Sequence, residues 1–273
     1  IIMSQATTGL NRNTTDKYYT SQNAVEICIE KIKNILNIHY ENDLCIEPSA
    51  GNGAFIEKLK SLCRNGEFYD IEPENEDIIQ QNYLDYQYHG HYSNVHIIGN
   101  PPFGRQSSLA IKFIKHSVTF CNSISFILPK SFKKDSLKKH FPIRFHLEAE
   151  IELPDMSFTI NGNPHNVPCV FQIWKKKDTG RIVPVKLEPK NFNFVKKSEE
   201  HDISFRRVGV YAGKIDKHTE NKSVQSHYFI KFDNFSDVLF DKLSLIDYKT
   251  KNNTVGARSI SKQELIKEFN MIL

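Results

Sequence analysis

Short apolar runs alternate with amphipathic helical patterns through the first half of this sequence, and this alternation restricts the possible fold more than any other feature. The apolar runs have the length of buried strands: Leu44–Ile46, Phe68–Ile71, Val95–Ile98 and Ser125–Leu128. Apolar residues recur at helical spacing in three further stretches: Ser21–Leu36, Phe55–Leu62 and Leu109–Cys121. Alternating strands and helices predict an α/β fold with a Rossmann-like, mostly parallel sheet and right-handed crossovers.

The pattern changes after about residue 140. Phe145–Leu153 and Val167–Trp174 predict two strands joined by a loop that contains Asn161-Gly162, so we expect an antiparallel strand to close the sheet. Beyond the polar stretch Lys175–Gly180, short strand-like pieces and many bases predict a smaller, mixed C-terminal domain. We therefore expect three parts: an N-terminal segment 1–20, a first domain 21–178 and a C-terminal region 179–273.

Charge is distributed unevenly along the 273 residues, whose formal net charge is +4. Residues 1–129 hold 10 Lys and Arg against 14 Asp and Glu, whereas residues 130–273 hold 26 against 18. A basic half beside an acidic half predicts a polyanionic partner for the second half, and an ordinary solvated surface is the alternative.

Composition excludes several other classes of protein. No run approaches the roughly 18 uncharged apolar residues of a membrane helix, and no hydrophobic signal core is found near the N-terminus. The five cysteines are odd in number and lack metal-ligand spacing, which favours reduced core residues over a metal site. We therefore expect an intracellular protein with neither a membrane segment nor a bound metal.

A glycine-containing segment, Glu47–Phe55, lies between a predicted strand and a predicted helix. Gly51 and Gly53 permit positive φ and close approach of a ligand to the backbone, although a simple tight turn also explains them. Asp70 ends the next strand, where a carboxylate in this architecture accepts hydrogen bonds from ribose hydroxyls. No Gly-Lys-Ser/Thr triplet follows the glycines, which disfavours a nucleoside triphosphate site.

A second motif, Asn100-Pro101-Pro102-Phe103, directly follows the Val95–Ile98 strand and Gly99. Open α/β sheets bind their ligands at the carboxyl ends of their strands, where this loop is expected. The two prolines stiffen the loop, Asn100 offers an amide donor and acceptor, and Phe103 offers a ring on which a planar base can stack. The motif therefore predicts a site for a flat, hydrogen-bonding substrate.

These two motifs, in this order, resemble those of S-adenosylmethionine-dependent amino-methyltransferases, particularly gamma-type N6-adenine methyltransferases. Asp16–Thr20 is similar to the family's methionine-binding segment, Asp70–Pro73 to its ribose-binding motif and Gln81–Leu84 to its adenine-binding motif, where Asn82-Tyr83 replaces the usual Asp-Phe. The resemblance covers roughly residues 16–175. It implies S-adenosylmethionine as the cofactor, bound by Tyr19, Thr20, Glu47, Pro48, Gly51, Gly53, Asp70, Ile71, Asn82 and Tyr83.

The resemblance also implies a catalytic set, Asn100, Pro101, Pro102 and Phe103. The Asn100 side-chain oxygen and the Pro101 carbonyl would accept the two hydrogens of an amino group, and Phe103 would stack on the flipped base. We expect Phe158, in the loop before the Val167–Trp174 strand, to meet the other face of the base. A place in the core is the alternative for Phe158.

Basic residues after the Ser125–Leu128 strand are the candidates for nucleic-acid contact. Several are interleaved with aromatic residues, a combination that suits phosphates and unstacked bases. We expect Lys130, Arg206, Arg207 and Lys214 to contact nucleic acid, with Arg206 and Arg207 reading base edges or phosphates. A solvated charged face is the alternative.

The leading hypothesis is thus methylation of adenine N6 in DNA. RNA adenosine methyltransferases, including cap-adjacent ones, also carry Asn-Pro-Pro-Phe, so competition between matched DNA and RNA must separate the two. A protein glutamine methyltransferase is a third hypothesis, although such enzymes typically carry a helical domain before the cofactor motif. A fourth is a binding module that has kept the fold without the activity, which the intact Asn100–Phe103 motif disfavours.

Overall fold

The computed structural model describes residues 17–273, so most of the expected segment 1–20, including Asp16, lies outside the described residues. The described residues form two compact units. The sheet unit comprises residues 17–128 and His140–Gly180, and the C-terminal unit comprises Pro129–Lys139 and Arg181–Leu273. The expected first domain, 21–178, includes residues 129–139, which belong to the C-terminal unit instead. Within the C-terminal unit, Lys134 Nζ donates to the Ser259 carbonyl oxygen at 2.7 Å, which joins this segment to the later residues.

A seven-stranded sheet forms the centre of the sheet unit, in the order β4-β3-β2-β5-β6-β10-β7. Its strands are β2 (Leu44–Glu47), β3 (Asn65–Asp70), β4 (Ile79–Gln80), β5 (Val95–Gly99), β6 (Ser123–Pro129), β7 (Phe145–Glu152) and β10 (Cys169–Lys176). The pairs β3–β4, β2–β3, β2–β5 and β5–β6 are parallel, and β7–β10 is antiparallel. The predicted α/β fold, with a mostly parallel sheet and an antiparallel closing pair, is confirmed.

Chain order reverses between β2 and β5, because β3 and β4 extend the sheet on one side and β6 on the other. Such a switch point leaves a crevice at the carboxyl ends of the two strands, where ligands bind in this class of fold. The Gly51 loop follows β2 and the Asn100 loop follows β5. The two motifs therefore meet at the crevice.

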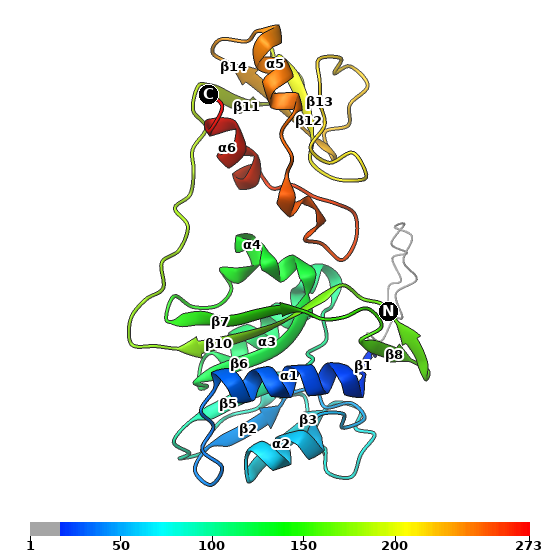
Figure 1. The fold of residues 1–273 in the computed structure, drawn as a ribbon, viewed down its shortest axis with the longest axis vertical. Coiled ribbons are helices and arrows are strands. Elements are labelled where there is room, and N and C mark those ends of the chain that lie inside the picture. Colours follow the sequence, from blue (N-terminus) through cyan, green and yellow to red (C-terminus); the bar gives the residue numbers. More distant parts are fainter. Residues whose placement is uncertain (1–16) are drawn as a thin grey trace. The chain divides into compact units, whose positions relative to one another are not determined.

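Figure 1 shows helices α1 (Gln22–Ile35) and α2 (Ile56–Leu62) beside the sheet of this unit. Their apolar residues are buried in one core with residues of β2 and β10. Ser21 caps α1, since its hydroxyl accepts the Ala24 N–H. Helix α3 (Ser108–Ser117) ends four residues earlier than expected, because the chain leaves the helix through turns after Ser117. All five cysteines are buried and unpaired.

A small separate sheet corrects the expected loop around Asn161-Gly162. Strands β8 (Phe158–Ile160) and β9 (Asn163–His165) form a hairpin, and β8 also pairs with β1 (Tyr19–Thr20). Asn161 and Gly162 have φ of +50° and +78°, the left-handed conformations that a two-residue hairpin turn requires. The hairpin thereby holds the Tyr19–Thr20 strand in place.

The C-terminal unit is built on a four-stranded antiparallel sheet in the order β11-β14-β12-β13. Its elements are β11 (Phe192–Val195), β12 (Ile203–Arg206), β13 (Ile215–Asp216), β14 (His227–Phe232), α4 (Asp135–Lys138), α5 (Asp237–Ser244) and α6 (Lys262–Asn270). Buried side chains such as Phe205, Ile230 and Phe269 give this unit its own core. The predicted smaller, mixed C-terminal part is confirmed. Among the described residues, no helix is long and apolar enough to cross a membrane.

Candidate active site

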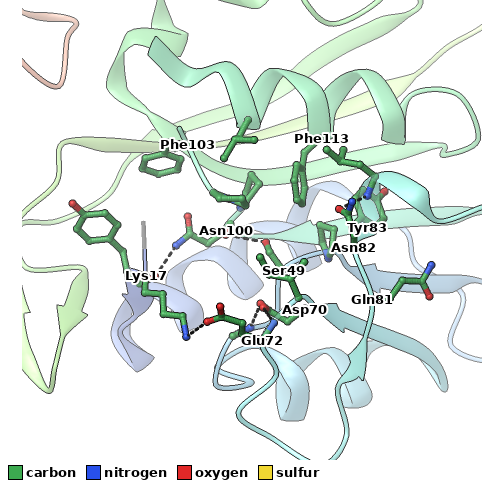
Figure 2. Close-up of a pocket in the computed structure, with 18 of the residues that line it drawn as sticks. Lys17, Ser49, Asp70, Glu72, Gln81, Asn82, Tyr83, Asn100, Phe103 and Phe113 are labelled. Atoms are coloured by element: carbon green, nitrogen blue, oxygen red, sulfur yellow. Dashed lines mark hydrogen bonds and ion pairs between the residues drawn. The ribbon is translucent and has the colours of Figure 1, made fainter. Parts of the chain in front are cut away.

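A cavity of about 330 Å³ lies at the carboxyl ends of the parallel strands. Its lining comes from the N-terminal segment, the loops after β2, β3 and β5, the short helix η1 (Tyr83–Asp85) and α3. In Figure 2, the rings of Phe103 and Phe113 lie at the upper side of the view and Asp70 and Glu72 at the lower side, with Asn100 between them. The cavity thus has an apolar wall and a charged wall.

The loop after β2 is shaped by its glycines and by Asp70. Gly51 has a φ of +54°, and its N–H donates to Asp70 Oδ2 at 2.8 Å. Asp70 Oδ1 accepts the Glu72 N–H at 2.9 Å, so both carboxylate oxygens are oriented by backbone donors. Each oxygen has a further lone pair with which it can accept a ligand hydroxyl. This geometry fits the ribose-binding role expected of Asp70.

Charged side chains from the N-terminal segment and the loop after β3 form a clasp at the cavity. Lys17 Nζ lies 2.7 Å from Glu72 Oε2 and 3.3 Å from Glu74 Oε1, and the Tyr19 hydroxyl donates to the same Glu74 oxygen. These carboxylates raise the pKa of Lys17, which stays charged at neutral pH. The clasp fixes the segment that carries Tyr18, Tyr19 and Thr20 beside the cavity.

Asn100 is held by that same segment. Its Nδ2 donates to the Tyr18 carbonyl oxygen and to Thr20 Oγ1, both at 3.3 Å, and its own carbonyl oxygen accepts from Ser49 Oγ at 3.1 Å. The Asn100 Oδ1 atom is buried and has no hydrogen-bond partner among the described residues. The orientation of the amide is therefore set by its donors, and its acceptor is left for a ligand that donates.

Aromatic and aliphatic side chains form the apolar wall. Tyr83 is almost fully buried, and its hydroxyl lies 2.8 Å from Ser117 Oγ, with its ring packed against Phe113. Asn82 also lines the cavity, but its side-chain amide is engaged locally, accepting from the Leu84 N–H and donating to Asp85 Oδ2. The Asn82 side chain therefore caps the η1 turn.

The structure brings most of the predicted cofactor and catalytic residues together. The lining includes Tyr19, Pro48, Gly51, Asp70, Ile71, Asn82, Tyr83, Asn100, Pro101, Pro102 and Phe103. Thr20, Glu47 and Gly53 do not line the cavity. Thr20 instead accepts a hydrogen bond from Asn100 Nδ2 through its Oγ1 atom. Gly53, with a φ of +84°, forms part of the turn that leads into α2.

Glu47 is 2% exposed, and its Oε2 atom has no hydrogen-bond partner within the part of the chain that the structure describes. Burial, with a further contribution from the Asp70 carboxylate, raises the pKa of Glu47 well above its usual range. Desolvation disfavours the charged form of an acid, so the neutral carboxyl is the form this position favours. Glu47 thus lies beneath the cavity as a buried acid.

The expectation that Phe158 stacks on a base is wrong for this structure. Phe158 lies in β8 rather than in a loop, is fully buried and belongs to the core shared by α1 and α2. Its ring packs edge-on against Tyr18. A ring with no exposed surface leaves no face for a ligand, so the core alternative holds.

The predicted nucleic-acid residues all lie in the C-terminal unit but do not line one cavity. Arg206 and Lys214 line one cavity, and Arg207 lines another of about 360 Å³ together with Tyr228 and Lys262. Lys130 lies in the short helix η3 (Lys130–Lys133) and lines neither cavity. No group of three potential metal ligands is found within residues 17–273.

Sequence reasoning assigned no role to several lining residues, among them Lys17, Ser49, Glu72, Glu74, Leu109 and Phe113. Lys17 and Glu72 belong to the motifs Asp16–Thr20 and Asp70–Pro73. Their ion pair joins residues 55 positions apart, so no local sequence pattern predicts it. Phe113 follows the Asn100 loop on a helix, where its helical spacing indicates only a buried face.

The sequence matches no protein-family model and no curated protein sequence. Similar solved structures include a proposed RNA methyltransferase from Pyrococcus horikoshii, at 14% identity and a TM-score of 0.46, over 62% of this chain and 92% of that chain. A proposed class I S-adenosylmethionine-dependent methyltransferase from Listeria monocytogenes is similar at 13% identity and a TM-score of 0.46, over 64% of this chain and 65% of that chain. A type I restriction-modification methyltransferase subunit from Streptococcus thermophilus is similar at 14% identity and a TM-score of 0.44, over 59% of this chain and 45% of that chain. This chain thus spans less than two thirds of the latter two, and similarity at this level assigns it neither substrate nor activity.

Proposed function

We propose that this protein transfers a methyl group from S-adenosylmethionine to the exocyclic N6 amino nitrogen of adenine in DNA. The observation that carries the proposal is the Asn100 side chain, whose Oδ1 is buried without a partner while its Nδ2 is fixed by two acceptors. An unsatisfied buried acceptor costs about 1–3 kcal/mol. A ligand amino group at this oxygen would supply the missing donor.

Asn100 would act on the nitrogen by geometry. The lone pair of an aromatic amino group is delocalised into the ring, which makes the nitrogen a poor nucleophile. When Asn100 Oδ1 accepts one amino hydrogen, it draws the nitrogen toward a tetrahedral shape and frees the lone pair to attack in line. The same oxygen stabilises the positive charge that forms on nitrogen. An amide is too weak a base to keep the proton, which then leaves to solvent.

The lining fits S-adenosylmethionine as the methyl donor. When bound, this cofactor supplies an electrophilic methyl group on a positively charged sulfur. Asp70, oriented by the Gly51 and Glu72 N–H groups, would accept the ribose hydroxyls, and the wall of Tyr83 and Phe113 would hold the adenine ring. Lys17 and Tyr19 would lie at the methionine end, in the segment expected to contact it.

The target base would lie against Phe103, which is half-buried beside Asn100. A base cannot reach such a cavity from within a duplex, so adenine would be extruded from the stack. Extruded bases are held by stacking on aromatic rings and by hydrogen bonds to their edges. The basic C-terminal unit would hold the surrounding polymer.

The test is incubation of the protein with methyl-labelled S-adenosylmethionine and duplex DNA, single-stranded DNA or RNA, followed by mass spectrometry of the nucleosides. We expect label on N6 of deoxyadenosine, lost in Asn100→Ala and kept in Asn163→Ala, which removes an exposed amide in the β9 hairpin. Label on RNA adenosine alone would mean that the polymer is RNA and not DNA. Label on a protein glutamine would mean that the substrate is a protein and not a nucleic acid. Absence of label from adenine in every polymer would overturn the proposal.

A further inference from the structure

A second cavity, of about 200 Å³, lies within the C-terminal unit at β12, β13 and β14. Its lining comprises Ser204, Arg206, Tyr211, Lys214, Ile215, Asp216, Lys222 and His227. Three of these side chains are cations and one is a carboxylate. Strand pairing brings them together, since Arg206 of β12 lies opposite His227 of β14.

The carboxylate in this cavity is already neutralised. Asp216 Oδ2 pairs with Lys222 Nζ at 2.5 Å, and Asp216 Oδ1 accepts the His218 N–H at 3.0 Å. The positive charges of Arg206 and Lys214 are therefore left without a counter-charge among the residues that line the cavity. The cavity as a whole favours an anion.

Arg206 is held in a fixed orientation. Its Nε donates to the Val208 carbonyl oxygen at 2.8 Å, and its Nη2 lies 3.3 Å from the position that a Cβ atom would take on Gly209. A side chain at position 209 would thus crowd the guanidinium, and the φ of +102° also favours glycine there. A guanidinium fixed through Nε keeps its two terminal nitrogens for a ligand.

His227 adds a buried ring nitrogen to the same cavity. The side chain is 8% exposed, and its Nδ1 lies 3.1 Å from both the Ser223 carbonyl oxygen and Ser226 Oγ. The carbonyl can only accept, so Nδ1 carries the proton, and Nε2 can donate to a ligand oxygen only when the ring is protonated. Burial lowers the pKa of His227, as do Arg206 and Lys222, while Asp216 opposes them.

Tyr211 gives the cavity an aromatic rim. The residue is 68% exposed, and Lys214 Nζ lies 5.7 Å from the ring centroid. An exposed ring beside two cations suits a nucleotide, whose base stacks on the ring while its phosphate meets the charges. A carboxylate ligand would make no use of this ring.

We infer that this cavity binds a single backbone phosphate of a nucleic-acid strand between Arg206 and Lys214, with an adjoining base on Tyr211. The identity of the polymer rests on the proposed function. The site itself rests on the fixed guanidinium, the uncompensated charge, the buried His227 and the exposed ring.

Salt dependence of binding tests whether the two cations share one phosphate. Affinity for a short duplex and for its single strand is measured by fluorescence anisotropy between about 50 and 200 mM salt, for Lys214→Gln, Arg206→Gln and the double variant. Each single variant should bind several-fold more weakly. The double variant should lose about 0.9 from the slope of log affinity against log salt, the value for one phosphate on duplex DNA. Lys186→Gln, an exposed lysine of the same unit, is the control for lost charge.

A loss near 1.8 in the double variant would mean two separate phosphate contacts, and an unchanged slope would mean none. Either result overturns the inference. Polyglutamate that competes as well as DNA would also overturn it, because the site would then be a carboxylate site.

Nuclear magnetic resonance of the His227 ring gives an independent readout, with His227→Gln used to assign the signal. DNA should raise the pKa of the ring in wild-type protein, because a bound phosphate offsets Arg206 and Lys222, and should leave it unchanged in the double variant. No change in wild-type protein would contradict the inference. If the protein methylates DNA but DNA does not change the pKa of His227, the phosphate site is contradicted and the proposed function stands. If DNA changes this pKa but no methylation occurs, the proposed function is contradicted and the phosphate site stands.

Discussion

The cavity of the sheet unit and the two cavities of the C-terminal unit differ in charge. Asp70, Glu72 and Glu74 line the first cavity, with Lys17 as its cation, whereas Arg206, Arg207 and Lys214 line the other two. Carboxylates suit hydroxyl and amino donors, while guanidinium and ammonium groups suit phosphates. The proposed methyl-transfer site, built on acceptors, would therefore repel the backbone of a nucleic acid, and we propose that another part of the chain holds that backbone.

The same regions differ in how firmly their key side chains are held. Asn100 is fixed by two hydrogen bonds from its Nδ2, and Asp70 by two backbone donors. Lys214 is exposed, and its Nζ lies 5.7 Å from the centroid of the Tyr211 ring. Chemistry at a nitrogen lone pair needs fixed geometry, whereas phosphate attraction is tolerant of position. Substitutions in the two units should therefore fail in different ways.

The largest effect is expected from Asn100→Ala. Loss of the only unpaired acceptor of this side chain should lower kcat by about 10²–10³-fold, the range seen when one group that stabilises transition-state charge is removed. Affinity for S-adenosylmethionine, measured by calorimetry, should change little. Affinity for DNA should be unchanged, because the basic cavities are untouched. Equal turnover in wild type and variant would contradict the role given to Asn100.

Asn100→Asp sharpens this prediction. The carboxylate keeps an acceptor but loses the Nδ2 donors to Tyr18 and Thr20, so its orientation is no longer set. We expect turnover between those of wild type and Asn100→Ala. Wild-type turnover in Asn100→Asp would mean that the fixed orientation is unimportant.

The next largest effect is expected from Asp70→Asn. A neutral amide cannot accept from the Gly51 and Glu72 N–H groups and from a ribose diol at once, and hydrogen bonds to a charged group contribute about 1.5–3 kcal/mol. The dissociation constant for S-adenosylmethionine should rise by about 10- to 100-fold. Calorimetry of Asp77→Asn, which removes an exposed carboxylate after the same strand, provides the matched control. Similar affinities for these two variants would exclude Asp70 from cofactor binding.

Glu47→Gln tests the buried acid beneath the cavity through pH. The pKa of Glu47 is raised in the folded protein, so above the usual value of about 4.3 the unfolded chain releases a proton that the folded chain keeps. Wild-type stability should therefore fall as pH rises toward the folded-state pKa, by at most about 1.4 kcal/mol per pH unit. Glu47→Gln should remove this fall.

The measurement is urea unfolding followed by fluorescence of Trp174, the single tryptophan, which is buried in β10 of the sheet unit. The stability difference between Glu47→Gln and wild type should grow in favour of the variant from about pH 5 upward. Glu57→Gln, on the exposed side of α2, controls for the loss of an acid. Parallel pH curves for wild type and Glu47→Gln would show that Glu47 titrates alike in the folded and unfolded chain.

Sequence alone predicted what local pattern specifies. The strand runs and the places of the two loop motifs after β2 and β5 were predicted correctly, because each depends on neighbours in the chain. Asn161-Gly162 is typical of a hairpin turn, but its three-residue strands are too short to give a strand pattern of their own. What depends on distant pairing was missed. His227 enters the cavity of Arg206 only because β14 pairs with β12, and adjacent arginines at 206 and 207 line different cavities.

The smallest effect is expected from Arg207→Gln. This variant tests most directly whether cofactor binding and DNA binding are independent of each other. Arg207 lies over the Tyr228 ring, 5.6 Å from its centroid, and lines the cavity that also contains Lys262. Its loss should weaken binding of DNA only a few-fold and lower the salt slope by about 0.9 on duplex DNA. The dissociation constant for S-adenosylmethionine should equal that of wild type and of Lys190→Gln, an exposed control. A weaker cofactor affinity in Arg207→Gln alone would mean that the acidic and basic regions do not act independently.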